Sequence, residues 1–91
     1  MKVHFLLKGT MLGTFLDHEF DLDLPEGSTL RDALKRAGRA RQVDFDRVMR
    51  EHEVIRESIL VSGDRLAWPQ GLDRVLQEGD QVYMLSPLAG G

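Results

Sequence analysis

The residues best suited to chemistry are the last six of the sequence, Ser86-Pro87-Leu88-Ala89-Gly90-Gly91. Gly90 and Gly91 carry no Cβ atom, so their backbone can approach other groups closely and adopt almost any φ and ψ. Pro87 fixes φ and has no N–H to pair with a neighbouring strand, so it should release this segment from a sheet. The pattern predicts a flexible tail over residues 86–91 that presents the carboxylate of Gly91. An ordinary frayed terminus is the alternative interpretation.

The rest of the sequence offers little other chemistry. It holds no cysteine, which excludes disulfides, thiolate metal sites and a cysteine nucleophile. It also shows no Ser/His/Asp set, no phosphate-binding glycine loop and no locally supported pair of catalytic carboxylates. The three histidines are far apart and are expected to be surface or half-buried residues rather than metal ligands: His4, His18 and His52. We therefore expect a chain that binds no metal or cofactor and catalyses no reaction by itself.

Acidic residues occupy every second position of one stretch: Asp17, Glu19, Asp21 and Asp23. This alternation is typical of the solvent-facing side of a strand. The stretch lacks the glycine and the final glutamate of a calcium-binding loop, so we do not expect a calcium site. A solvated strand face is the favoured interpretation, and an acidic surface that meets a basic partner is the other.

Composition limits the class of protein. The 91 residues fit one domain, and 42% hydrophobic and 30% charged residues are ordinary for a globular protein. The net charge of −3 argues against a nucleic-acid binder that works by neutralising phosphates. No apolar run reaches the roughly 18–20 residues of a membrane span, and an alternating pattern begins where a signal peptide would lie. We expect a cytoplasmic protein that contacts neither membranes nor nucleic acids.

Two alternating stretches predict an antiparallel hairpin. Apolar residues occupy every second position of residues 2–8 and again of residues 20–24, which indicates two half-buried strands. The residues expected to face inward are Val3, Phe5, Leu7, Phe20, Leu22 and Leu24. Residues 9–13 contain two glycines and predict the connection between the strands.

A helix is predicted over residues 29–38. Thr29 and Asp32 form a capping-box-like pair at its start, and apolar residues follow at helical spacing. Gly38 lies where a C-terminal glycine cap is expected. Residues 39–42 would then link this helix to a second short helical pattern, which comprises Asp44, Phe45, Val48, Met49 and His52.

The next part of the sequence predicts a second hairpin. Residues 58–62 are rich in β-branched and apolar side chains, Gly63-Asp64 indicates a turn, and residues 65–68 can return as the partner strand. Residues 72–76 are ambiguous, and a helical turn is one interpretation of them.

A final strand is predicted over residues 81–85, after a turn at Glu78-Gly79-Asp80. Because the strand is apolar on both faces, it is typical of a central position in a sheet. Alternation places two of its apolar residues against the helix and leaves three apolar residues for the outer face: Tyr83, Leu85 and, from the first strand, Leu6. An exposed apolar patch marks an interaction site, so we predict that these residues help to dock partners. The alternative is that residues 39–57 cover them.

The order of elements is hairpin, helix, short helix, hairpin and final strand. It predicts one α+β domain over residues 1–85, with a mixed sheet of four to five strands wrapped around one main helix.

Several motifs, taken in order and with their distance from the terminus, resemble one family. They are Leu24-Pro25-Glu26-Gly27-Ser28-Thr29-Leu30-Arg31-Asp32-Ala33-Leu34, Val61-Ser62-Gly63, Glu78-Gly79-Asp80-Gln81-Val82 and Ser86-Pro87-Leu88-Ala89-Gly90-Gly91. Together with the element order they resemble the ubiquitin-like β-grasp proteins. Among these, the chain looks most like the prokaryotic sulfur carriers, which are the small subunit of molybdopterin synthase and its relative in thiamin thiazole synthesis. The resemblance covers essentially the whole chain.

The resemblance implies a specific chemistry for Gly91. In this family a separate adenylating enzyme of the ubiquitin-activating type uses ATP to adenylate the terminal carboxylate, and a sulfur donor then displaces AMP to leave a thiocarboxylate. The adenylate is needed because a carboxylate is a poor electrophile. A narrow channel in each partner enzyme would suit Leu88, Ala89 and the two glycines. The absence of cysteine removes an internal thiol that would compete for the activated acyl group.

The same resemblance implies a sulfur acceptor, the large subunit of molybdopterin synthase, because the last five residues are most similar to that tail. Ser86 stands where that tail often has another proline, and other pathways stay open: thiamin, tRNA thiolation or a specialised metabolite. Two alternatives belong to other classes. One is a ubiquitin-like modifier that forms isopeptide bonds with lysines, and the other is a plain binding module whose terminal glycines are incidental.

Overall fold

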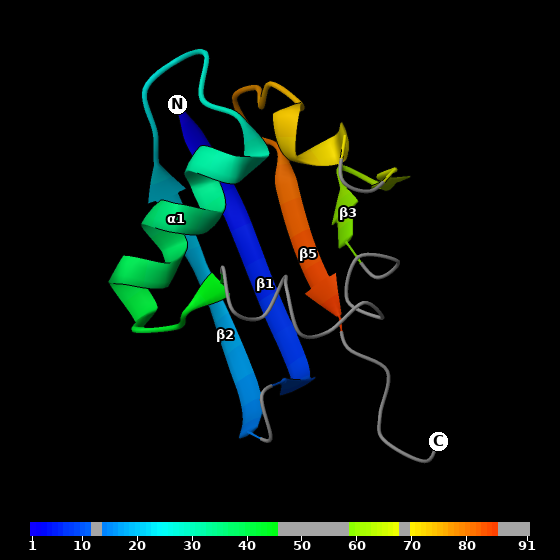
Figure 1. The fold of residues 1–91 in the computed structure, drawn as a ribbon. Helices are drawn as coiled ribbons and strands as arrows, with labels where there is room; N and C mark the ends of the chain where they lie inside the picture. Colours follow the sequence, from blue (N-terminus) through cyan, green and yellow to red (C-terminus); the bar gives the residue numbers. More distant parts are fainter. Residues whose placement is uncertain (12–13, 46–58, 68–69, 86–91) are drawn as a thin grey trace.

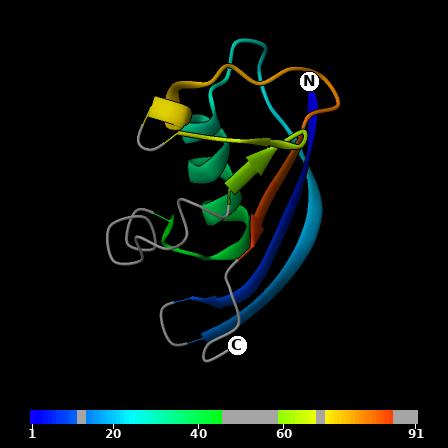
Figure 2. The ribbon, with the colours of Figure 1, turned by 90° about the vertical axis from the view of Figure 1, so that its right-hand side faces the viewer.

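A computed structural model describes residues 1–11, 14–45, 59–67 and 70–85. In these residues the chain forms a five-stranded sheet and one α-helix (Figure 1). The elements are β1 (Lys2–Met11), β2 (Thr14–Asp23), α1 (Leu30–Arg41), β3 (Ile59–Val61), β4 (Asp64–Arg65), the 3-10 helix η1 (Gln70–Asp73) and β5 (Gln81–Leu85). Figure 2 shows the sheet curving around α1, which lies on one of its two faces. The predicted α+β class is confirmed.

The strand order is β2-β1-β5-β3-β4, so the last strand in the sequence lies between the first and the third. β5 runs parallel to β1 and antiparallel to β3, and the two hairpins are antiparallel. Figure 1 shows β1 and β5 side by side in the middle of the sheet. The predicted central position of the final strand is confirmed, and this mixed sheet with one helix is compatible with a ubiquitin-like β-grasp fold.

The first hairpin is longer than predicted. β1 and β2 pair without interruption from Lys2↔Asp23 to Met11↔Thr14. The prediction that residues 9–13 form the connection was therefore wrong, because Gly9 continues the strand opposite Leu16 with a φ of 131°. The ladder gives β2 a long outer edge of unbroken register.

The helix begins as predicted and ends later. At its start the Thr29 backbone N–H donates to Asp32 Oδ2 at 3.0 Å, and the Asp32 N–H donates to Thr29 Oγ1 at 3.3 Å. Gly38 is not the C-cap, because the helix continues to Arg41 and Gln42 takes the left-handed conformation with a φ of 58°. Gly38 is an interior residue of the helix, and Val43 packs against it. This packing leaves no room for a side chain, because a Cβ atom at Gly38 would lie 2.6 Å from the Val43 carbonyl oxygen.

The second hairpin turns one residue earlier than predicted. Ser62 and Gly63 form the two-residue turn with φ values of 48° and 87°, and Asp64 already pairs with Val61. Two residues with positive φ fit the type I′ turns that match the twist of a hairpin. β4 ends at Arg65 rather than residue 68. Residues 72–76 are helical only in part, because η1 begins at Gln70 and ends at Asp73.

The core lies between α1 and the inner face of the sheet. From the sheet, Phe5, Val82 and Met84 are fully buried, and from the helix Ala33 and Ala37 are fully buried. Phe45 of the second predicted helical pattern is also buried, whereas Val48, Met49 and His52 lie outside the described residues. No helix in the described part of the chain is long and apolar enough to cross a membrane.

Candidate functional site

Figure 2 shows α1 on one face of the sheet, and we call the opposite face the outer face. Three apolar residues of the three middle strands are neighbours on this outer face. Leu6 of β1 and Leu60 of β3 are both register partners of Tyr83 in β5. All three are half-buried, whereas their strand neighbours Phe5 and Val82 are fully buried on the inner face. We call Leu6, Leu60 and Tyr83 the outer patch.

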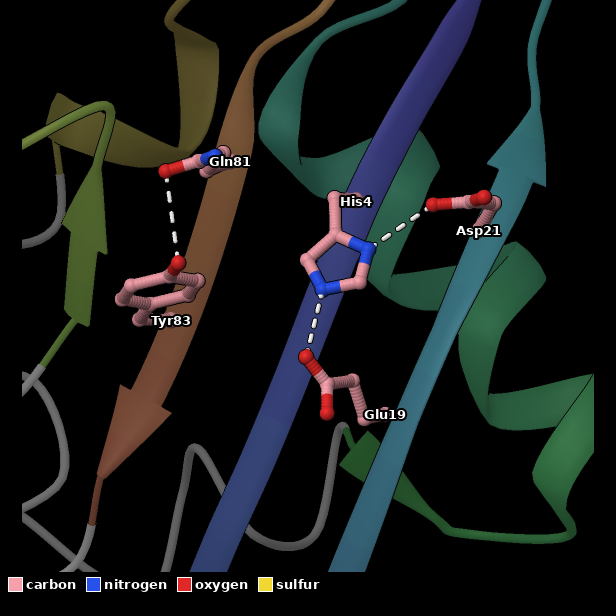
Figure 3. A network of polar contacts seen from close by, with 5 residues as sticks. All are labelled: His4, Glu19, Asp21, Gln81 and Tyr83. Carbon is pink, nitrogen blue, oxygen red and sulfur yellow. Dashed lines mark hydrogen bonds and ion pairs between the residues drawn. The ribbon is translucent and has the colours of Figure 1, made fainter.

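Two of the three residues predicted for docking belong to the outer patch, namely Leu6 and Tyr83. Leu85, the third, lies beside it as the register partner of Lys8 and is 37% exposed. Leu60 was missed, because nothing local in the sequence indicates that β3 pairs with β5. The Tyr83 hydroxyl donates to Gln81 Oε1 at 3.2 Å, so the polar end of the ring keeps a partner at the surface (Figure 3). A role for these residues in partner binding stays a prediction.

His4 is held between two carboxylates of β2 beside the outer patch (Figure 3). Its Nδ1 lies 2.8 Å from Asp21 Oδ1, and its Nε2 lies 2.8 Å from Glu19 Oε2. The hydrogen bond to Asp21, followed by that to Glu19, raises the pKa of His4 above its ordinary value of 6.5, and slight desolvation opposes them. Both ring nitrogens donate only in the protonated imidazole, so this geometry fits a histidinium cation.

The sequence predicted a surface or half-buried His4, which is confirmed, since its side chain is 32% exposed. Its carboxylate partners were missed. The signal was the hairpin register, which places His4 opposite Asp21 once the turn is located. The predicted solvated strand face is also confirmed, because all four acidic residues of the stretch are exposed: Asp17, Glu19, Asp21 and Asp23.

No three His, Cys, Asp or Glu side chains are placed to hold a metal ion among the residues that the structure describes. Glu19 and Asp21 bind different nitrogens of the His4 ring, so the three groups do not converge on one point. His18 lies opposite Leu7 in the hairpin and is half-buried, and His52 lies outside the described residues.

A polar network fixes the start of β5. The carboxylate of Asp80 accepts from Ser62 Oγ at 2.7 Å and from the Gln77 N–H at 2.8 Å. The Asp80 carbonyl accepts from the His4 N–H at 2.9 Å, and the Gln81 N–H donates to Ser62 Oγ at 3.2 Å. The start of β5 is therefore hydrogen-bonded both to β1 and to the β3–β4 turn. These contacts fix the strand whose other end leads into the predicted tail.

The tail itself, residues 86–91, lies outside the described residues. It contains the six remaining predicted site residues, Ser86, Pro87, Leu88, Ala89, Gly90 and Gly91. Their predicted roles rest on the sequence and on the position of β5, after which they follow directly.

Comparison with known proteins finds a relative over the full length. An uncharacterized protein of Archaeoglobus fulgidus is 29% identical to this chain over 94 residues, and the alignment covers 100% of both proteins. No protein-family model matches the chain, and no solved structure is significantly similar to it. The relative is similar along the whole chain, and its description carries no activity.

Proposed function

We propose that this protein is a sulfur carrier of the ubiquitin-like β-grasp type, and that Gly91 carries the sulfur as a thiocarboxylate. The observation behind the proposal is that the sequence Ser-Pro-Leu-Ala-Gly-Gly directly follows β5, the central strand of a mixed sheet compatible with that fold. The proposed sulfur acceptor is the large subunit of molybdopterin synthase. The proposed activating partner is an ATP-dependent adenylating enzyme of the ubiquitin-activating type.

The proposed chemistry has two steps at the carboxylate of Gly91. A carboxylate oxygen attacks the α-phosphorus of ATP, a P–O bond forms and pyrophosphate leaves. Sulfide then attacks the carbonyl carbon of the acyl-adenylate, so that a C–S bond forms as the C–O bond to AMP breaks. Two terminal glycines suit both steps because no side chain obstructs the approach of a catalytic group or of the nucleophile. In this proposal the partner enzymes supply catalysis and the chain acts as a carried substrate.

The outer patch is proposed as the docking surface for the activating enzyme. Apolar patches that reach the surface mark interaction sites, and the outer patch consists of two half-buried leucines and one half-buried tyrosine. Gly91 lies eight positions beyond Tyr83, and an extended chain spans about 3.3 Å per residue. A partner docked on the patch therefore finds the terminus within roughly 26 Å, enough to enter a recessed active site.

The experiment is incubation of the full chain with ATP, sulfide and a purified adenylating enzyme of the ubiquitin-activating type, followed by intact mass spectrometry. We expect the mass to rise by the difference between a sulfur and an oxygen atom, and the change to map to the peptide that ends in Gly91. The matched control lacks Gly91 and should show no change while its thermal unfolding is unaltered. A sulfur atom on the shortened variant, or none on the intact chain with several such enzymes, would contradict the proposal.

Docking is tested separately with Leu60→Ser and Val75→Ser. Leu60 belongs to the outer patch, whereas Val75 is a 56% exposed apolar residue that forms a β-bridge with Thr29, away from the patch. We expect the KM of the activating enzyme for the Leu60→Ser carrier to rise about ten-fold with kcat unchanged, since an interface anchor contributes more than 1 kcal/mol. Val75→Ser should leave both constants unchanged, and equal effects of the two substitutions would exclude the patch as the docking surface.

The ubiquitin-like modifier is the second candidate, because it would use the same activated tail. Conjugates between Gly91 and lysines of other proteins, without a thiocarboxylate, would favour it in the same incubation supplied with a cell lysate.

A further inference from the structure

Among the described residues, no strand pairs with the outer edge of β2, so most backbone N–H and C=O groups along this edge have no ladder partner. Met1 and Leu24 exchange both hydrogen bonds, with the Met1 amine donating to Leu24 at 2.7 Å and the Leu24 N–H donating to Met1 at 2.8 Å. Hydrogen-bonded and non-bonded pairs alternate along an antiparallel ladder. Because the register continues without a bulge, the odd-numbered residues of β2 direct their N–H and C=O groups away from β1.

Two contacts support this direction. The Arg36 side chain donates to the Asp23 carbonyl at 3.1 Å, so that carbonyl faces away from β1. On the other side of the ladder, the Lys2 carbonyl accepts from Gly79 and the His4 N–H donates to Asp80, both in the segment that leads into β5. Even-numbered residues of β1 therefore point toward β5, as the same alternation requires.

This edge lacks most of the features that keep edge strands from pairing. Natural edges are blocked by short length, bulges, proline, a covering helix or loop, or charged side chains, above all lysine. β2 carries charge only as acidic side chains, which disfavour a like-charged strand and not a basic one. β2 is 10 residues long, pairs in unbroken register, and contains neither proline nor lysine. Among the described residues, no further strand lies beyond it in the sheet. A long, regular edge is a template on which an extended peptide can form main-chain hydrogen bonds.

The side chains along the edge select the charge of an added strand. Asp17, Glu19, Asp21 and Asp23 are four of the residues whose backbone faces outward, and their side chains share the outer face of the sheet with Leu6. β1 already places cations opposite three of them, because Lys2, His4 and Lys8 are the register partners of Asp23, Asp21 and Asp17. A strand added on the other side of β2 would lie beside the same four acidic side chains, which we call the acidic row.

We propose that the outer edge of β2 binds an extended basic segment of a partner protein by antiparallel strand addition. Lysine or arginine at every second position meets the acidic row, since opposite charges across strands are favourable. The intervening positions lie beside the inner face, where the Arg41 guanidinium is 4.2 Å from the centre of the Phe20 ring. Those positions take small neutral or β-branched residues. A second copy of β2 is disfavoured as the occupant because acidic rows would face each other.

This interaction does not rest on the proposed sulfur-carrier function, and amide hydrogen exchange of the full chain tests it. The probe is a short capped peptide in which lysine alternates with threonine and valine. In the free protein, the amides of Asp17, Glu19 and Asp21 should exchange fast and those of His18 and Phe20 slowly. At saturating peptide, the three outward amides should slow by about ten-fold or more, because strand pairing protects them. No protection at these three amides would overturn the proposal.

Controls separate strand addition from simple charge attraction. Methylation of the lysine amide nitrogens, which removes the donors aimed at β2, should abolish binding, whereas methylation of the same number of intervening amides should not. A peptide of the same composition with its lysines clustered at the ends should bind more weakly. Equal binding of all these peptides would overturn the proposal.

A charge reversal in the protein gives an independent test. The carboxylate of Asp17 is exposed, and Asp17→Lys should weaken binding of the alternating peptide about five-fold through the loss of one favourable cross-strand pair and the gain of a repulsive one. Glu26→Lys makes the same charge change in the exposed turn before α1 and should leave the affinity unchanged. Equal weakening by the two substitutions would show attraction to the net charge alone and overturn the proposal.

Discussion

Gly38→Ala is the substitution that most directly tests the packing of α1. Alanine is the best helix former, and replacing a helical glycine with it normally stabilises a protein by about 1 kcal/mol. At this position a Cβ atom would lie 2.6 Å from the Val43 carbonyl oxygen and 3.0 Å from Phe45 Cδ2. The structure therefore predicts that the usual gain is reversed.

The magnitude follows from what holds Val43 in place. Its N–H donates to the Gly38 carbonyl at 2.9 Å, and its carbonyl accepts from the Phe45 N–H at 3.0 Å. Phe45 is itself buried in the core, so the clash cannot be relieved without moving the segment from Val43 to Phe45. Overpacking costs about 1–3 kcal/mol, and one lost hydrogen bond costs about 1 kcal/mol. After the helix gain is subtracted, the net loss of unfolding free energy is about 1–3 kcal/mol.

Urea unfolding followed by far-ultraviolet circular dichroism measures this change. A loss of 1 kcal/mol corresponds to a fall in Tm of about 4–8 °C for a domain of this size. The calibrating variant is Ala40→Gly, two positions along the same helix at an exposed site, which should lose up to about 1 kcal/mol from helix propensity alone. If Gly38→Ala is as stable as the parent chain or more stable, Val43 yields without cost and the reasoning is refuted.

Two further substitutions test the helix end and the histidine between carboxylates. Gln42 adopts a φ of 58°, so Gln42→Gly should raise the unfolding free energy by about 0.5–1 kcal/mol, measured in the same urea assay, and a loss would contradict the left-handed cap. The pKa of His4 is raised in the folded state, so its contribution to stability is complete below a pH of about 6.5 and is lost as pH rises through the folded-state pKa. His4→Gln should therefore lower the unfolding free energy by about 1 kcal/mol between roughly pH 5 and 6.5, where carboxylates are ordinarily ionised and the imidazole is charged, with a smaller deficit at alkaline pH. A deficit that does not change with pH would contradict the pairing with Glu19 and Asp21.

The parts of the fold that depend on neighbouring residues were predictable from the sequence. Alternation through Val3, Phe5 and Leu7 indicates which face of a strand is buried. The Thr29–Asp32 pair indicates where a helix begins. Both signals arise from residues that lie only a few positions apart in the sequence. The end of the helix was not predictable in this way. Glycine at position 38 suggested a helix end, but it is required there because Val43 and Phe45 occupy the space beside it after the chain has turned back.

The candidate site depended on contacts that no local pattern contains. Tyr83 and Leu6 could be assigned to an outer face by alternation alone. Their pairing and the addition of Leu60 required the order of strands, which is set by burial of the whole sheet against α1. The positions of Glu19 and Asp21 around His4 likewise depend on the hairpin register, and the prediction had placed the hairpin connection at residues 9–13.

The sheet order also decides how the two proposed interaction surfaces relate to each other. The outer patch is centred on β5, the proposed strand-addition edge belongs to β2, and β1 lies between them. Two strand spacings separate β2 from β5 by roughly 10 Å, about one Debye length at physiological salt.

A strand added in the plane of the sheet at β2 leaves the face over Tyr83 free, so the two partners do not compete for the same atoms. Between the two surfaces, Leu6 of β1 is the register partner of both Glu19 and Tyr83. Neutralising the acidic row would therefore alter the charge beside the patch without covering it.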